Sequence, residues 1–138
     1  MFTERHTTPS KIFHNTFLAG AAGGLFALVL KPVVMKSYNH VTLYDATALC
    51  NGVLTGLVAI CASADRVEPW AAFCIGALAA LFYVLFCKFL QVACIDDPVE
   101  GSAVHFMGGA WGLVANGFFD NQRGLFYATD GKGHYFGY

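Results

Sequence analysis

The chain has 138 residues, of which 57% are hydrophobic and 12% charged, with a formal net charge of −1. Soluble domains contain about 45–50% apolar and about 25% charged residues, because polar groups must cover their surface. This composition excludes a soluble globular domain and an intrinsically disordered chain. The balanced charge, with no basic stripe, excludes a nucleic-acid-binding protein. An integral membrane protein is the remaining class.

Four apolar runs follow one another, at about residues 15–30, 46–64, 70–93 and 102–119. A membrane-spanning helix needs about 17–25 mainly apolar residues. None of the runs alternates as the strands of a membrane barrel do. We therefore predict an all-α integral membrane protein with four transmembrane helices over residues 15–119. A polar N-terminal segment, residues 1–14, precedes them, and a polar and aromatic tail, residues 120–138, follows.

Prolines and acidic residues mark the ends of the predicted helices. Pro32 is predicted to end the first helix, because proline disrupts a helix interior. Asp45 precedes the second run and is expected to cap it. At the fourth run, Asp97 is predicted as the N-cap and Pro98 as the first helical residue. Glu100 adds negative charge at the positive helix end.

Glycine pairs with G-x-x-x-G spacing occur on three of the four predicted helices. Such spacing lets helix backbones approach closely, which matters in a membrane because lipid gives little hydrophobic drive for helix association. Glycine is common in membrane helices in general, but three repeats favour a closely packed bundle. The pairs are Gly20 and Gly24, Gly52 and Gly56, and Gly108 and Gly112.

His105, near the start of the fourth run, is the candidate residue for function. An ionisable group in a membrane span is costly and marks a pathway, a relay or a polar partner. Imidazole donates at one nitrogen and accepts at the other, so it can line a path for a small polar solute. The alternative is a neutral histidine bonded to a neighbouring helix. Asn51 and Asn116 are expected to form helix–helix hydrogen bonds.

The sequence gives no support for an enzyme, a metal site or a cofactor. No nucleophile–base set, metal cluster or phosphate loop is visible. The five cysteines lack C-x-x-C spacing and are interpreted as small apolar residues.

From about residue 14 to residue 127, the chain resembles the ammonium transporter family (Amt/Mep, related to Rh proteins). The motifs are YDATALCNG at 44–52, GLVAI at 56–60, VEPWAA at 67–72, and DDP at 96–98 followed by His105, Gly109, Trp111 and Gly112. The resemblance implies about eleven spans in two inverted halves, trimeric assembly, and a pore between the halves. This chain corresponds to helices seven to ten only.

By the same resemblance, ammonium is recruited at an outer aromatic site, loses a proton and passes along a narrow hydrophobic pore. Two facing histidines line that pore, and His105 matches the second. The sequence departs from the family pattern at four positions. Phe106 stands where the family usually has glycine, and Cys61 replaces a threonine. Asp65 and Arg66 occupy a loop that is usually uncharged.

These departures lead us to expect a structural, non-conducting component of a larger membrane protein complex. The alternative is half of a split ammonium or ammonia channel, in which another chain supplies the first half and His105 is a pore histidine. A fragment of a longer protein is a third possibility. The expected partners are other integral membrane subunits and lipid, without nucleic acid; ammonium is expected only with a complementing chain. An organellar inner membrane, such as that of mitochondria, is the expected location.

Overall fold

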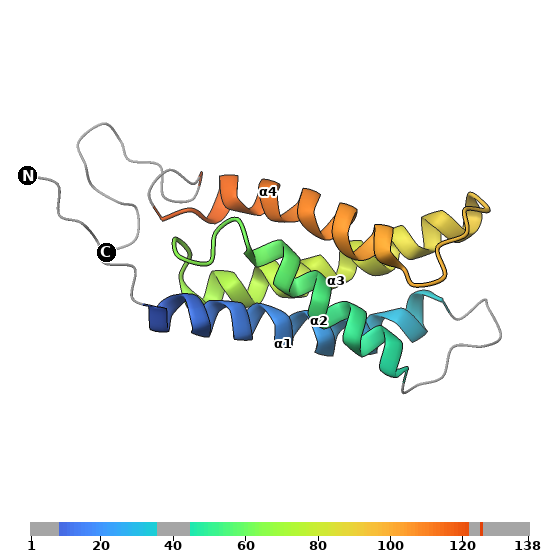
Figure 1. The fold of residues 1–138 in the computed structure, drawn as a ribbon, viewed down its shortest axis with the longest axis horizontal. Coiled ribbons are helices and arrows are strands. Elements are labelled where there is room, and N and C mark those ends of the chain that lie inside the picture. Colours follow the sequence, from blue (N-terminus) through green and yellow to red (C-terminus); the bar gives the residue numbers. More distant parts are fainter. Residues whose placement is uncertain (1–8, 36–44, 122–124, 126–138) are drawn as a thin grey trace, which may run out of the picture.

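The computed structural model describes residues 9–35, 45–121 and 125. Helix α1 spans Pro9–Val34, α2 spans Ala46–Ile60 and α3 spans Pro69–Val92. The π-helical turn η1, Ala103–Met107, continues into α4, Gly108–Phe119. These elements form an elongated bundle (Figure 1). No strand occurs in these ranges, and the predicted all-α class is confirmed.

The helices are arranged around α2 and α3. Helix α1 packs against both of them, while η1 and α4 also contact both. Among the described residues, α1 and α4 do not contact each other, so they lie on opposite sides of the α2–α3 pair. The last turn of α1, the first turn of α2 and the start of η1 meet at one end of the bundle (Figure 1).

Helix α1 is longer at both ends than the sequence predicted. It begins at Pro9, so residues 9–14 of the expected polar segment belong to it. It also continues through Pro32 to Val34, and the expectation that Pro32 ends the helix is wrong. Pro32 removes one backbone donor. The turn is nevertheless closed by the Met35 amide, which donates to the Lys31 carbonyl at 2.9 Å.

The other helices differ less from the predicted runs. Helix α2 has 15 residues and ends at Ile60 instead of residue 64, because residues 61–66 form hydrogen-bonded turns. Asp45 caps α2, as expected, by accepting from the Thr47 amide at 2.9 Å. By length and composition, α1 and α3 can each cross a membrane. Helix α2 and the η1–α4 segment are shorter, and their crossing stays a prediction.

Glycines bring the helix backbones close together. A Cβ atom on Gly112 would lie 2.5 Å from the Ala59 carbonyl oxygen, and one on Gly108 would lie 3.0 Å from the Thr55 side chain. At the α1–α2 crossing, added Cβ atoms would meet the facing helix in the same way at Gly20, Gly24, Gly52 and Gly56. Two glycines outside the three motifs have equally close neighbours: Gly23 faces Gly52 and Gly56, and Gly76 faces Ala19.

Candidate functional site

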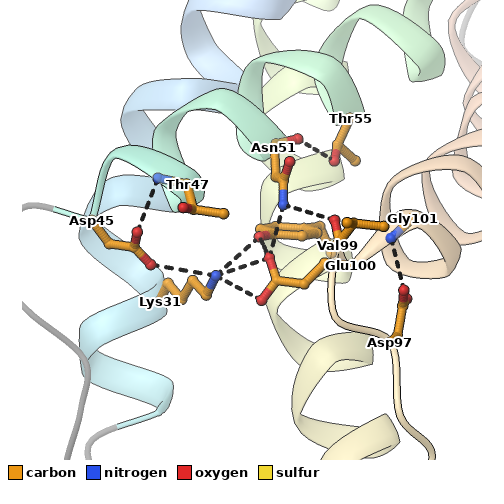
Figure 2. Close-up of polar contacts among 10 residues, drawn as sticks. Lys31, Asp45, Thr47, Asn51, Thr55, Asp97, Val99, Glu100 and Gly101 are labelled. Atoms are coloured by element: carbon orange, nitrogen blue, oxygen red, sulfur yellow. Dashed lines mark hydrogen bonds and ion pairs between the residues drawn. The ribbon is translucent and has the colours of Figure 1, made fainter.

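A buried polar cluster lies at the end of the bundle where α1 ends and α2 begins. We call Lys31, Asp45, Asn51, Tyr83 and Glu100 the Lys31 cluster. Figure 2 labels Lys31, Asp45, Asn51 and Glu100. The Lys31 side chain is only 7% exposed. Its Nζ lies 2.7 and 2.9 Å from the two Glu100 carboxylate oxygens and 3.5 Å from Asp45 Oδ2. One lysine therefore forms ion pairs with two carboxylates.

Glu100 is also held by α2 and α3. Asn51 Nδ2 donates to Glu100 Oε2 at 2.9 Å and to the Val99 carbonyl at 3.3 Å. The Tyr83 hydroxyl donates to the same carboxylate. Burial opposes ionisation of the Glu100 carboxyl, but the three donors and the nearby ammonium charge outweigh it and lower its pKa. Three helices thus fix one carboxylate in the loop before η1.

Asp97 orders the same loop from within. Its carboxylate accepts from the Gly101 amide at 3.0 Å and the Ser102 amide at 2.9 Å. Hydrogen bonding to Ser102 and Gly101 lowers the pKa of the Asp97 carboxyl. Pro98 lies in the turn before the helix. The prediction that Pro98 is the first helical residue is therefore wrong. The Asp97 carboxylate bonds to the Gly101 and Ser102 amides across a turn that contains Pro98.

Glu100 also differs from the sequence prediction. It has a φ of 56°, in the left-handed region, and its carbonyl accepts from the Val104 amide at 3.0 Å. Its carboxylate pairs with Lys31 instead of acting only as a charge at the helix end. The side chain of Glu100 thus contacts α1, while its backbone begins the first turn that leads to His105.

His105 lies on the π-helical turn η1, and its side chain is exposed. Short π-helical segments are rare and occur frequently at functional sites. Phe106 is also 65% exposed, and its ring centroid lies 5.7 Å from that of Phe86 on α3. Within the ranges that the structure covers, His105 makes no hydrogen bond to a neighbouring helix. The other histidine in these ranges, His14, bonds to Ser10 near the start of α1.

The two asparagines expected to form helix–helix hydrogen bonds lie on α2 and α4. Asn51 donates to Val99 and Glu100 in the loop before η1, where a partner on a neighbouring helix was expected. The Asn116 side-chain oxygen is buried without a hydrogen-bond partner among the described residues. In the same ranges, no group of three histidine, cysteine or acidic side chains is arranged to hold a metal ion. Most of the predicted polar and aromatic tail, residues 120–138, lies outside the described residues.

Sequence reasoning assigned no role to Lys31 or Tyr83. A signal for Lys31 was present, because a charged side chain that lies within a membrane span usually pairs with an opposite charge. Lys31 ends one apolar run and Glu100 precedes another, which makes them possible partners. The pairing spans 69 positions, however, and no local spacing rule connects them.

Comparisons with known proteins agree with this fold. The model of the Ammonium Transporter Family matches residues 1–137. The chain is 36% identical over 114 residues to "Putative ammonium transporter 1" of Caenorhabditis elegans, covering 83% of this chain and 20% of that protein. It is 37% identical over 122 residues to "Ammonium transporter Amt2" of Archaeoglobus fulgidus, covering 88% and 25%.

The fold also resembles a solved structure, that of Saccharomyces cerevisiae Mep2. The TM-score is 0.70 at 29% sequence identity, and the match covers 80% of this chain and 23% of Mep2. This chain therefore spans about a fifth to a quarter of the length of these relatives.

Proposed function

Because the chain belongs to the ammonium transporter family, whose members are integral membrane proteins, we propose that it supplies one wall of an ammonium or ammonia pathway. The observation that carries this proposal is the exposed imidazole of His105 on the η1 turn. In this proposal, His105 is the pore-lining residue.

The surroundings of His105 suit a narrow path for a small polar molecule. A neutral imidazole can accept a hydrogen bond from ammonia at one nitrogen and donate one at the other. The same segment exposes Phe106, Leu113 and Val114, whose apolar side chains would disfavour water and ions beside the path. Recognition would therefore depend on one polar group within an apolar wall.

Phe106 is one of the departures that led us to expect a non-conducting chain. Its ring packs beside Phe86 on α3, while His105 stays exposed. This contact places the Phe106 ring beside α3, with 65% of the residue still exposed, and supports the proposal that the ring does not block the His105 side of the segment. In this proposal, Phe106 forms part of the apolar wall and leaves the path beside His105 open.

A closed pathway needs a second wall. The part of the chain that the structure describes places no other histidine beside His105. We propose that helices outside residues 9–121, from another chain or another part of the same polypeptide, face η1 and α4. By family resemblance, this second wall would carry the other pore histidine.

A structural, non-conducting role in a larger membrane complex is the second candidate. It is favoured by the closely packed glycine crossings, which form a rigid bundle, and by exposed apolar side chains such as Phe13, Phe17 and Val33 on α1. These side chains suit contact with lipid or other membrane subunits. An organellar inner membrane, such as the mitochondrial one, belongs to this candidate as the proposed location.

A flux measurement separates the two candidates. The complete assembly would be isolated from its native membrane under mild detergent, its chains identified by mass spectrometry, and the whole reconstituted into vesicles. Ammonium-dependent flux would be compared for the wild type, His105→Ala and the matched control His14→Ala. We expect His105→Ala to lower flux by at least about tenfold, since it removes the polar group of the path, and His14→Ala to leave it unchanged. Equal flux with and without His105 would rule out His105 as the pore-lining residue. No flux in the wild type would favour the structural, non-conducting role.

A further inference from the structure

We propose that Lys31 and Glu100 are positioning residues that hold the η1 turn, and with it His105, in place against the bundle. The significance for transport rests on the proposed function, in which His105 lines the pathway. The positioning of η1 itself depends only on the contacts of the Lys31 cluster. Neither residue needs to touch the transported molecule.

The connection from Lys31 to His105 is short and continuous. Lys31 Nζ holds both carboxylate oxygens of Glu100, at 2.7 and 2.9 Å. The Glu100 carbonyl accepts from the Val104 amide at 3.0 Å, and Val104 directly precedes His105. A shift of Glu100 would therefore break the hydrogen bond that begins the turn. The left-handed φ of Glu100, 56°, fixes the direction in which the chain enters η1.

The cluster joins three helices, α1, α2 and α3, to the loop before η1. Lys31 reaches Glu100 from α1, Asn51 from α2 and Tyr83 from α3. Asp45, the cap of α2, shares the Lys31 ammonium at 3.5 Å, and the Tyr83 ring centroid lies 5.7 Å from Nζ. Three helices thus fix the position of the η1 turn at one point. Such support suits a turn whose side chain, His105, must be held accurately toward a facing wall.

The charge of Lys31 is essential to this arrangement. The cluster contains one ammonium and two carboxylates, on Glu100 and Asp45. Removing the ammonium would leave two like charges close together and poorly hydrated, and they would repel one another. Glu100 would then leave its position and the η1 turn would loosen. An arginine at position 31 would keep the positive charge and the attraction.

Hydrogen exchange on the complete membrane protein tests the inference without using transport. The variants are Lys31→Met, which removes the charge, Lys31→Arg, which keeps it, and the milder Glu100→Gln. Lys11→Met and Glu68→Gln are matched controls, because Lys11 and Glu68 form an ion pair at the other end of the bundle. The readout is amide exchange in peptides covering residues 101–108, compared with peptides from the middle of α3.

We expect Lys31→Met and Glu100→Gln to raise exchange at residues 101–108 by at least about tenfold, with the middle of α3 unchanged. Lys31→Arg and the two controls should exchange like the wild type in this segment. Wild-type exchange at residues 101–108 in Glu100→Gln, or an equal increase throughout the chain, would overturn the positioning role. If Lys31→Met does not fold, Glu100→Gln still decides the question.

Flux through the same variants separates this inference from the proposed function. Local loosening with at least about a tenfold loss of flux would support both. Local loosening with unchanged flux would sustain the positioning role and count against His105 as a pathway residue. A loss of flux in His105→Ala, together with unchanged exchange in Glu100→Gln, would support His105 as a pathway residue and count against the positioning role.

Discussion

The two lysine–glutamate pairs of α1 differ greatly in their surroundings, although they have the same chemical design. In each pair, the lysine lies on α1 and the glutamate lies just before another helix. Lys11 and Glu68 approach to 3.3 Å with side chains 32% and 43% exposed. Lys31 and Glu100 approach to 2.7 Å with side chains 7% and 20% exposed.

The difference in burial changes what each pair contributes. Water solvates and screens the exposed pair, so its loss changes stability little. The buried pair is different, because removing one partner strands the other charge away from water. Glu100 also accepts hydrogen bonds from Tyr83 and Asn51, which extends the pair into a network across three helices. Glu68 also accepts a hydrogen bond from Asn121 Nδ2. Burial therefore distinguishes the two pairs more clearly than the presence of further hydrogen bonds.

The largest predicted difference between the two ion pairs is in the stability lost when each lysine is replaced. Lys31→Met should lower the free energy of unfolding by about 3–5 kcal/mol, because it leaves the Glu100 and Asp45 carboxylates unpaired. Lys11→Met should lower it by less than about 1 kcal/mol. Thermal or denaturant unfolding in detergent micelles measures both. Equal effects at positions 31 and 11 would contradict the distinction.

A glycine substitution tests whether backbone packing also secures α4. Gly112→Leu should lower stability by about 1–3 kcal/mol and reduce the yield of assembled protein. The reason is that its Cβ would lie 2.5 Å from the Ala59 carbonyl oxygen. Gly117→Leu is the matched control on the same helix, since no other described part of the chain comes within 4 Å of its added Cβ. Unchanged stability and assembly in Gly112→Leu would refute close packing as a requirement.

The smallest predicted effect is the change in the free energy of unfolding as the pH falls. The pKa of the Glu100 carboxyl is lowered in the folded state, so its ionised form stabilises the fold. This contribution is complete above the ordinary glutamate pKa of 4.5 and is lost as the pH falls through the lower folded value. Unfolding measured from neutral to acidic pH should therefore show a loss of stability that Glu100→Gln reduces and Glu68→Gln retains. An identical acid response in Glu100→Gln and the wild type would be inconsistent with an ionised Glu100 in the cluster.

The sequence predicted those parts of the fold that depend on local pattern. Apolar runs located the helices, and α3 begins at Pro69, one residue from the expected start. Asp45 was recognised as a cap because a cap acts on the next turn of its own helix. The glycine spacing placed contacts on the correct helices but missed Gly23 and Gly76, which do not belong to the three motifs.

The Lys31 cluster could not be predicted in the same way. Its members come from three helices and a loop, and Lys31 and Glu100 are 69 positions apart. The same contacts explain why α1 was assigned too early an end. Lys31 is anchored by Glu100 and Asp45, and its carbonyl still accepts from Met35, so the helix continues past Pro32. The exposure of His105 likewise depends on how η1 packs, which no spacing of residues specifies.

A structure of the assembly, isolated from its native membrane under mild detergent and determined by electron cryomicroscopy, tests the central claim most directly. The account predicts that the His105 imidazole faces a second helical wall across a narrow apolar passage, with another imidazole within hydrogen-bond reach. It also predicts that Lys31 and Glu100 remain paired beside the η1 turn. A His105 side chain that faces lipid, or is sealed against a continuous apolar surface with no passage beside it, would contradict the claim.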